Sequence, residues 1–415
     1  MNNRWFQLVA SLVAMIMIAN LQYSWTLFVR PLQQGNGWTL AEVQWAFTLF
    51  VLFQTWVQPI DGWLIDRVGT RRFITLAGVL SGGGWAALAY ASALPQLYIF
   101  YAIAGIGAAL VYSGCIGSAL KWFTDRRGLA AGIIAAGFGG GTALFIPFIA
   151  YAIRVHGYRT AFLWTGVFQG LVIVMAAQFL RHPAPGMVTA PAAAARSSRN
   201  RRNQEQFTTG EMLRTPHFYV LYLMFVMMSI GGLVATAQAG PVAQSFGLPL
   251  AALTLATTLN PLANGASRIS WGWVSDRLGR ESTMAIAFFL QALSLLSVLT
   301  LGRTSGFWFT VTLFATFFTW GEIYSLFPSI VGDWFGTRHA TSNYGFMYSA
   351  KGVASIFGGG VAALLFQQFG SWSATFYGSA ALAFLAGVMA LGLRKAPLPS
   401  KAVVGVTMER AVQSS

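Results

Sequence analysis

The chain has 415 residues, of which 56% are hydrophobic and only 9% are charged, whereas soluble domains carry roughly 25% charged residues. This composition excludes a soluble globular protein and indicates a membrane protein that the lipid bilayer surrounds. The net charge of +15 does not predict nucleic-acid binding, because the sequence offers no basic soluble domain for it.

Twelve segments are apolar enough to cross a bilayer, which requires about 20 mostly apolar residues. The first is too long for the h-region of a signal peptide, and no small-residue cleavage site follows it, so we expect a membrane helix there. The predicted spans are residues 5–29, 42–62, 73–92, 96–119, 128–152, 160–181, 216–238, 250–273, 282–302, 306–331, 342–366 and 373–393.

The lysines and arginines indicate the orientation of these spans, because such residues concentrate in cytoplasmic loops. If both termini face the cytoplasm, twenty of the 26 basic residues fall on that side and four on the other. The remaining two, Arg268 and Lys351, lie inside spans. We therefore expect a multi-pass protein with both termini in the cytoplasm.

A polar segment divides the chain in the middle. Residues 183–213 are rich in Pro, Ala, Ser and Arg and have no apolar periodicity, so we expect a mobile cytoplasmic linker. Six spans precede it and six follow. The expected domains are an N-terminal six-helix bundle over residues 1–182, the linker over 183–213, a C-terminal six-helix bundle over 214–395 and a cytoplasmic tail over 396–415.

The two halves share loop motifs. GWLIDRVGTRR, residues 62–72, follows the second span, and GWVSDRLGRE, residues 272–281, follows the eighth at an offset of 210. A Trp-Phe pair recurs at residues 122–123 and 334–335, at an offset of 212. Duplicated halves are typical of secondary transporters, whose binding sites lie between the halves near the bilayer midplane.

Two basic residues lie deep inside predicted transmembrane spans. Arg268 is eight residues from Asp276 at the predicted cytoplasmic boundary, or about 12 Å deep, and Lys351 is nine residues from Ser342, or about 14 Å deep. Half of the hydrocarbon core is about 15 Å thick. A lone cation at such a depth costs about 2.5–3.5 kcal/mol, so the pair predicts an anionic ligand near the midplane.

The loop motif G-x-L-x-D-R-x-G-x-R-R after the second span, its weaker copy after the eighth, the twelve spans and the long linker together resemble the major facilitator superfamily. The resemblance covers almost the whole chain. It implies an all-α membrane protein with twelve transmembrane helices in two pseudo-symmetric six-helix bundles, which rock about a central site.

Charged residues of the two repeated loops lie at predicted cytoplasmic helix ends. The resemblance favours a conformational latch that joins the bundles in the outward-facing state and releases in the inward-facing one. The alternative is a static surface ion-pair cluster, which contributes little to stability. The expected latch residues are Asp66, Arg67, Arg71, Asp276, Arg277 and Arg280.

Several stretches more narrowly resemble the bacterial oxalate/formate antiporters. They are NRWFQLV (3–9), LQYSWTLFVRPL (21–32), KWFTDRRGLAAG (121–132), NGASRISWGWVSD (264–276), WGEIYSLFP (320–328) and YSAKGVASIFGGG (348–360). Arg268 and Lys351 match this family's helix-8 arginine and helix-11 lysine. The resemblance implies an inner-membrane carrier that exchanges oxalate for formate without a cofactor, and we expect a monomer.

The same resemblance implies further substrate-binding residues, which are Gln22, Tyr23, Tyr112, Trp320 and Tyr324. Tyrosine and glutamine can donate hydrogen bonds to carboxylate oxygens, and Trp320 could seal a small cavity. Tyr23 lies nearer the outer face, as a gate would. Taken singly, each of these residues is more typical of packing or of a helix interface, whereas as a set on three helices they fit a cavity and a packing role about equally well. Phe138 departs from the family pattern, which has a tyrosine there, so one hydroxyl donor is lost and the identity of the anion stays open.

Oxalate carries two carboxylates, so one cation for each is a chemical match: arginine binds one end with a bidentate fork, and lysine acts as a point charge on the other. Without an anion the cations would be poorly compensated, which favours obligatory exchange. Glu322, also near mid-depth, could instead tune the charge by pairing with Lys351 or Arg268. One cation would then remain, and a monocarboxylate such as formate, lactate or pyruvate would fit better.

Three rival functions are weighed against exchange. A proton-coupled monocarboxylate carrier usually needs an intramembrane acid or histidine, and Glu322 is the only deep acid. A photoreceptor with a retinal Schiff base on Lys351 is disfavoured by twelve spans in two repeated halves. An enzyme is disfavoured because the sequence shows no metal-ligand spacing and no nucleophile–base constellation. We therefore expect no metal and no catalytic residue.

Overall fold

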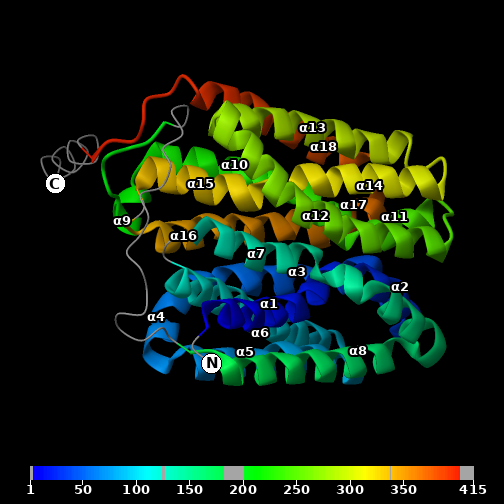
Figure 1. Ribbon diagram of the computed structural model, residues 1–415. Coiled ribbons are helices and arrows are strands. Elements are labelled where there is room, and N and C mark those ends of the chain that lie inside the picture. The colour runs from blue at the N-terminus through cyan, green and yellow to red at the C-terminus, as the bar shows by residue number, and fades with distance from the viewer. Residues whose placement is uncertain (1–2, 124–126, 182–200, 337, 402–415) are drawn as a thin grey trace, which may run out of the picture.

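The computed structural model describes residues 3–123, 127–181, 201–336 and 338–401, and every regular segment in these ranges is a helix (Figure 1). The N-terminal helices are α1 (Arg4–Tyr23), α2 (Trp25–Asn36), α3 (Leu40–Trp56), α4 (Gln58–Val68), α5 (Thr70–Ala87), α6 (Leu94–Trp122), α7 (Arg127–Gly140) and α8 (Ile146–Phe179), with short 3₁₀ turns at Leu88–Tyr90 and Gly141–Leu144.

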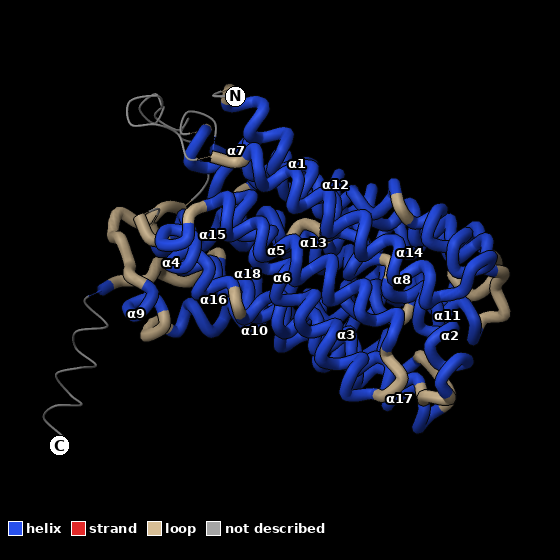
Figure 2. The backbone as a smooth tube through the Cα atoms, turned by 90° about the horizontal axis from the view of Figure 1, so that it is seen from below, coloured by secondary structure: helices blue, strands red, loops and turns tan. Residues whose placement is uncertain are grey.

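The C-terminal helices follow the linker. They are α9 (Thr209–Met212), α10 (Pro216–Ala237), α11 (Ala239–Ser245), α12 (Leu250–Leu278), α13 (Arg280–Thr300), α14 (Gly306–Trp320), α15 (Ile323–Phe335), α16 (Ala340–Ile356), α17 (Ala362–Phe369) and α18 (Ser373–Leu393), with a π-helical turn at Phe357–Val361. Figure 2 shows helices and loops alone throughout the described chain. The predicted all-α fold is confirmed.

Within the described ranges the helices make twelve passes, as predicted. Nine helical segments of the described chain are by themselves long and apolar enough to span a membrane. One of these, Gly132–Phe179, has 48 residues and turns sharply at Gly157. Gly157 has a φ of 80°, a backbone conformation that glycine adopts easily. The segment therefore makes two passes. The polar helix α12 and the broken pair α14–α15 complete the set.

Several passes consist of two consecutive helices. The breaks fall at Ser24 between α1 and α2, at Val57 between α3 and α4, and at Gln238 between α10 and α11. Proline in the first turn of α4 favours the break at Val57, because proline lacks the backbone N–H that would continue the helix. Hydropathy predicts a single span across each of these breaks, because a break of one residue does not change the mean hydropathy of the segment.

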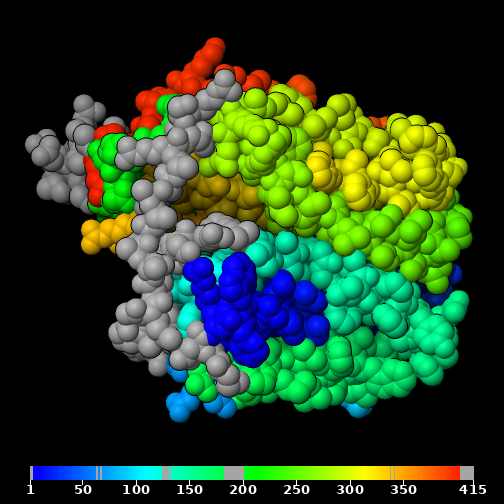
Figure 3. All heavy atoms as spheres, viewed as in Figure 1, coloured from blue at the N-terminus to red at the C-terminus, as the bar shows by residue number. Residues whose placement is uncertain are grey.

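The helices form two layers, with α1–α8 in one and α10–α18 in the other (Figure 1). The space-filling view shows the same division, the blue-to-green N-terminal half lying below the green-to-red C-terminal half (Figure 3). The boundaries at 1–182, 183–213 and 214–395 stay a prediction, because residues 182–200 lie outside the described ranges.

The layers meet where α3 packs on α16 and where α7 packs on α12. Thr48 Oγ1 donates to the Ser355 carbonyl at 3.0 Å, and Ser355 Oγ donates to the Thr48 carbonyl at 3.1 Å, so each layer bonds the other's backbone. A Cβ on Gly139 would lie 3.0 Å from Gly265 Cα, so glycine at this position favours the close approach of α7 to α12. Ser355 lies four residues from Lys351, and Gly265 lies three residues from Arg268, so these contacts are about one helical turn from the two intramembrane cations.

Residues 201–213 of the linker and 396–401 of the tail are bonded to each other and are here together called the strap, which lies at the α9 end of the C-terminal layer (Figure 1). The Arg201 guanidinium donates to three main-chain oxygens at the end of α18, at 2.6–3.1 Å. It thereby satisfies carbonyls that a helix end leaves unpaired. Arg202 Nε lies 3.1 Å from Asp333 Oδ1 at the end of α15.

Phe207 fixes the strap to the layer beneath it. Its ring is fully buried and meets the Phe335 ring edge-on at 5.6 Å, and its backbone N–H donates to the Phe335 carbonyl at 2.8 Å. Hydrogen bonds from the Thr208 backbone and from Lys401 hold the pKa of nearby Glu211 below its usual range. The expectation of a mobile linker is therefore wrong for residues 201–213, because an aromatic anchor and several hydrogen bonds hold them.

Substitution of the anchor tests the strap. Phe207→Ala should lower the thermal unfolding temperature in detergent and expose residues 201–215 to protease, because removal of a buried phenylalanine costs about 3–5 kcal/mol. Gln204→Ala is the matched control, since Gln204 is exposed in the same segment. Equal unfolding temperatures and equal proteolysis for the two variants would contradict the anchoring role of Phe207.

Candidate functional site

The two intramembrane cations lie together at the boundary between the layers. Arg268 on α12 is 6% exposed, and Lys351 on α16 is fully buried. Both lie against one ring, that of Tyr324 on α15, with Arg268 Cζ at 4.3 Å and Lys351 Nζ at 5.7 Å from its centroid. The electron-rich face of an aromatic ring attracts cations. The structure thus brings Arg268, Lys351 and Tyr324 together.

Lys351 bonds to both layers. Its Nζ donates to Gln22 Oε1 on α1 at 2.9 Å and to Gln54 Oε1 on α3 at 3.0 Å, and it lies 3.5 Å from the Tyr348 hydroxyl on its own helix. Gln22 was expected here. Gln54 was missed, because a glutamine in an apolar span has no spacing that marks it out.

Arg268 also bonds to both layers. One terminal nitrogen donates to the Ala135 carbonyl on α7 at 2.8 Å, and the other donates to Asn264 Oδ1 at 2.9 Å. The Tyr23 hydroxyl donates to the same Asn264 oxygen at 3.4 Å. Asn264 was missed, although its position four residues before Arg268 places the two side chains on one helix face.

Aromatic rings complete the wall around the cations. Tyr112 stacks on Tyr348 at 5.9 Å and meets Phe138 edge-on at 5.5 Å. Phe138 has no hydroxyl to offer, but its ring lies 5.8 Å from Lys351 Nζ, which keeps a cation–ring contact. Trp320 meets Tyr324 edge-on at 5.5 Å. Gln22, Tyr23, Tyr112, Trp320 and Tyr324 therefore all lie close to the cations or to their immediate neighbours.

The site contains more hydrogen-bond donors than the protein uses. Buried groups without a hydrogen-bond partner among the described residues include the following in this cluster: Gln22 Nε2, Asn264 Nδ2, Arg268 Nε, Trp320 Nε1 and Tyr324 Oη. The four nitrogens can only donate, and the tyrosine hydroxyl can donate or accept. Buried polar groups are normally paired. A cluster of unpaired donors beside two cations suits a ligand that offers only acceptors, which is an anion.

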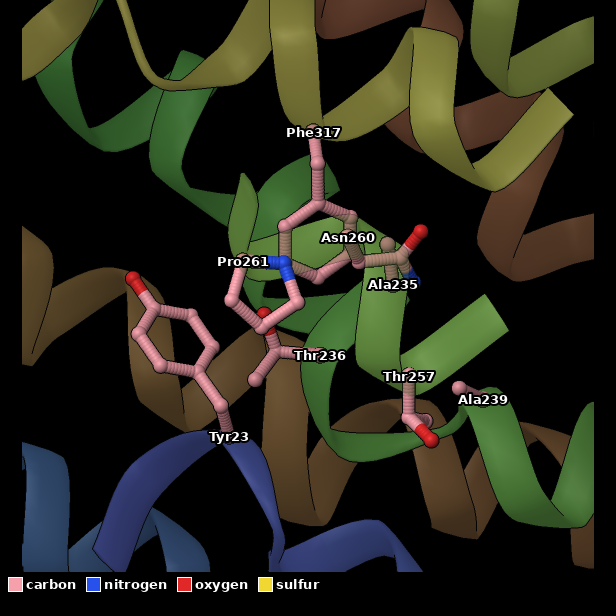
Figure 4. Close-up of a pocket in the computed structure, with 8 residues that line it drawn as sticks. All are labelled: Tyr23, Ala235, Thr236, Ala239, Thr257, Asn260, Pro261 and Phe317. Atoms are coloured by element: carbon pink, nitrogen blue, oxygen red, sulfur yellow. The ribbon is translucent and has the colours of Figure 1, made fainter. Parts of the chain in front are cut away.

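A small pocket lies beside this cluster, next to Tyr23 (Figure 4). It is lined by Tyr23, Ala235, Thr236, Ala239, Thr257, Asn260, Pro261 and Phe317. Tyr23 is its only lining residue from the N-terminal layer, and Asn260 lies eight residues before Arg268 on α12, or about 12 Å along the axis. Tyr23 therefore contacts both this pocket and Asn264 of the cation site, and its role as a gate stays a prediction.

Glu322 does not compensate either cation. Its side chain is fully buried at the junction of α14 and α15, and neither carboxylate oxygen has a hydrogen-bond partner within the described chain. The ion pairs found among the described residues do not include one from Glu322 to Arg268 or Lys351. The bridge considered from the sequence is absent from these residues, so Glu322 forms no ion pair with either cation there.

The described contacts of the expected latch residues in the second loop include bonds within the C-terminal layer. Arg280 lies 2.9 Å from Asp276 and 3.0 Å from Asp333 at the end of α15. The Arg277 guanidinium lies over the Trp273 ring at 3.5 Å from its centroid. These contacts hold the ends of α12, α13 and α15 together.

The first loop is described in part. Arg71 Nε donates to Gln178 Oε1 on α8 at 2.8 Å, a bond within the N-terminal layer. The side chains of Asp66 and Arg67 lie outside those that the structure describes. The latch between the two loops stays a prediction.

Comparison with known proteins identifies related chains. A family model described as the Major Facilitator Superfamily matches residues 10–242 and 221–410. The sequence is 39% identical over 390 residues to the oxalate:formate antiporter of Oxalobacter formigenes, covering 94% of this chain and 91% of that protein. It is 27% identical over 242 residues to monocarboxylate transporter 11 of Homo sapiens, covering 57% of this chain and 48% of that one.

A solved structure has a similar fold. The crystal structure of a mutant of the peptide transporter POT in complex with alafosfalin aligns with a TM-score of 0.69 at 16% identity, covering 94% of both chains. This likeness shows the arrangement of helices alone.

The unpaired carboxyl of Glu322 has a measurable consequence for stability. Glu322→Leu should keep or raise the thermal unfolding temperature, because a buried polar group without hydrogen bonds costs about 1–3 kcal/mol. Asp333→Leu is the contrast, since it removes the partner of Arg202 and Arg280 and should lower that temperature. A fall for Glu322→Leu as large as that for Asp333→Leu would show that Glu322 is bonded.

Proposed function

The chain belongs to the major facilitator superfamily and, within it, to the family of the Oxalobacter formigenes oxalate:formate antiporter, and we propose that it is a secondary active transporter that exchanges oxalate for formate by alternating access. It is a multi-pass membrane protein. The proposal extends to a cell inner membrane with both termini in the cytoplasm, and to a monomer as the working unit.

One observation carries the substrate class: two buried cations share a site with unpaired hydrogen-bond donors. A dicarboxylate offers two anionic ends and only acceptors, so it can compensate both charges. Arg268 would bind one carboxylate through its planar fork, and Lys351 would bind the other as a point charge. The short carbon skeleton of oxalate suits two cations that lie against one Tyr324 ring.

The aromatic and amide groups have supporting roles in this proposal. Gln22 and Tyr324 would donate to the carboxylates, while Tyr112 and Trp320 would shape the cavity and exclude water. Tyr23 would close the outer side, next to the small pocket. The two repeated loops, with Asp66, Arg67, Arg71, Asp276, Arg277 and Arg280, would stabilise one closed end of the carrier during the cycle.

The lack of an ion pair between Glu322 and either cation favours exchange of a dianion over proton-coupled transport of a monocarboxylate. A carboxylate paired with one cation would leave a single positive charge, which suits lactate, pyruvate or formate. Glu322 has no such pair among the described residues. Two uncompensated cations therefore favour oxalate as the better-bound substrate, and formate can occupy the same site as the smaller counter-anion.

The proposal is tested by transport in reconstituted liposomes. Wild-type protein should take up labelled oxalate when the liposomes contain formate, and Arg268→Gln or Lys351→Gln should each reduce this uptake at least about tenfold, because a hydrogen bond to a charged group contributes about 1.5–3 kcal/mol. Arg154→Gln, which removes an exposed arginine at a predicted loop, is the matched control. Undiminished oxalate exchange in either cation variant would contradict the proposal.

A further inference from the structure

The protein's own oxygens occupy the hydrogen-bonding capacity of Lys351. A lysine ammonium has three N–H donors and no acceptor. Three oxygens surround this one: Gln22 Oε1 at 2.9 Å, Gln54 Oε1 at 3.0 Å and the Tyr348 hydroxyl at 3.5 Å. A substrate carboxylate can therefore reach Nζ only if it displaces at least one of them.

Gln54 differs from the other two ligands of Lys351. Tyr348 lies on the same helix as Lys351 and moves with it, and Gln22 has an unpaired Nε2 that can bind substrate directly. Gln54 is 2% exposed and lies on α3, in the opposite layer. The bond between the Gln54 amide oxygen and the Lys351 ammonium joins α3 to α16. A substrate carboxylate bound between the layers would connect them in the same way.

The packing next to this bond brings α3 and α16 into close contact. Gly352 follows Lys351 on α16, and a Cβ there would lie 2.7 Å from Trp56 Cδ1 on α3. The two helices therefore touch one residue away from Lys351. This close approach of the helices places Gln54 beside Lys351 while the layers are together.

On the basis of the proposed exchange, we propose that Gln54 is an internal substitute for the substrate carboxylate, and that it sets how much net anion release accompanies exchange. Net release requires the carrier to return without an anion, so Lys351 must then find another acceptor. The Gln54 oxygen supplies one. A neutral amide binds an ammonium less strongly than a carboxylate does, so the return without an anion is slower than exchange but measurable.

The test compares two rates on the same proteoliposomes, with valinomycin and potassium to clamp the membrane potential. Liposomes loaded with labelled oxalate are diluted into medium with unlabelled oxalate, which reports exchange, or into medium without oxalate or formate, which reports net release. The ratio of net release to exchange does not depend on how much protein folded. The variants are Gln54→Leu, Gln54→Glu and the control Gln169→Leu, a buried glutamine on α8 whose side chain has no bond within the described chain.

Gln54→Leu should lower the ratio at least about tenfold, because Lys351 loses an acceptor that is needed only when no anion is bound. Gln54→Glu should raise the ratio and raise the oxalate concentration for half-maximal exchange, because a fixed carboxylate then competes with the substrate. Gln169→Leu should leave the ratio unchanged.

An unchanged or higher ratio for Gln54→Leu, a lower ratio for Gln54→Glu, or wild-type exchange with no detectable net release would each overturn the role of Gln54. Failure of the proposed function would be distinguished from these outcomes, because the wild-type protein would then show no oxalate exchange.

Discussion

Two positive charges buried between the layers are the constraint on which the other features of this protein depend. Each costs about 2.5–3.5 kcal/mol at the middle of a bilayer, and Glu322, the nearest acid by sequence depth, does not pair with either within the described chain. Neutral oxygens and aromatic faces offset part of this cost. Gln22, Gln54 and Ala135 supply the oxygens that lie in the opposite layer.

The same bonds couple the charges to the movement of the layers. Both cations belong to the C-terminal layer, and their partners in the other layer would separate from them when the carrier opens. A substrate that bridges the cations can replace these partners and carry its own negative charge. Exchange then follows from electrostatics, because the loaded site is better compensated than one bonded only to neutral groups.

The sequence revealed the charges but not how they are held. Arg268 and Lys351 stand out because charged residues are rare within apolar spans, and their depth follows from helical rise. Gln54 and Asn264 do not stand out, because single amides are compatible with a span and their partners lie on other helices. The contacts of Glu322 could not be inferred, since a small rotation of one helix decides whether its carboxyl meets a cation.

Elsewhere the sequence failed where tertiary contacts override composition. Residues 201–213 have the composition of a mobile linker, yet Phe207 is buried against Phe335. That phenylalanine, in an otherwise polar stretch, was the available signal. The twelve passes were predictable from hydropathy, whereas the breaks at Ser24, Val57 and Gln238 were not, because they arise from local backbone geometry.

The central claim is that each cation binds one carboxylate of a dianion. Calorimetric titration of purified wild-type protein and the Lys351→Gln variant with oxalate and with formate tests it most directly. The account predicts that the wild type binds oxalate more tightly than formate, and that Lys351→Gln weakens oxalate binding at least about tenfold while formate binding, which Arg268 retains, changes much less. Equal losses for both anions, or unchanged oxalate binding, would contradict it.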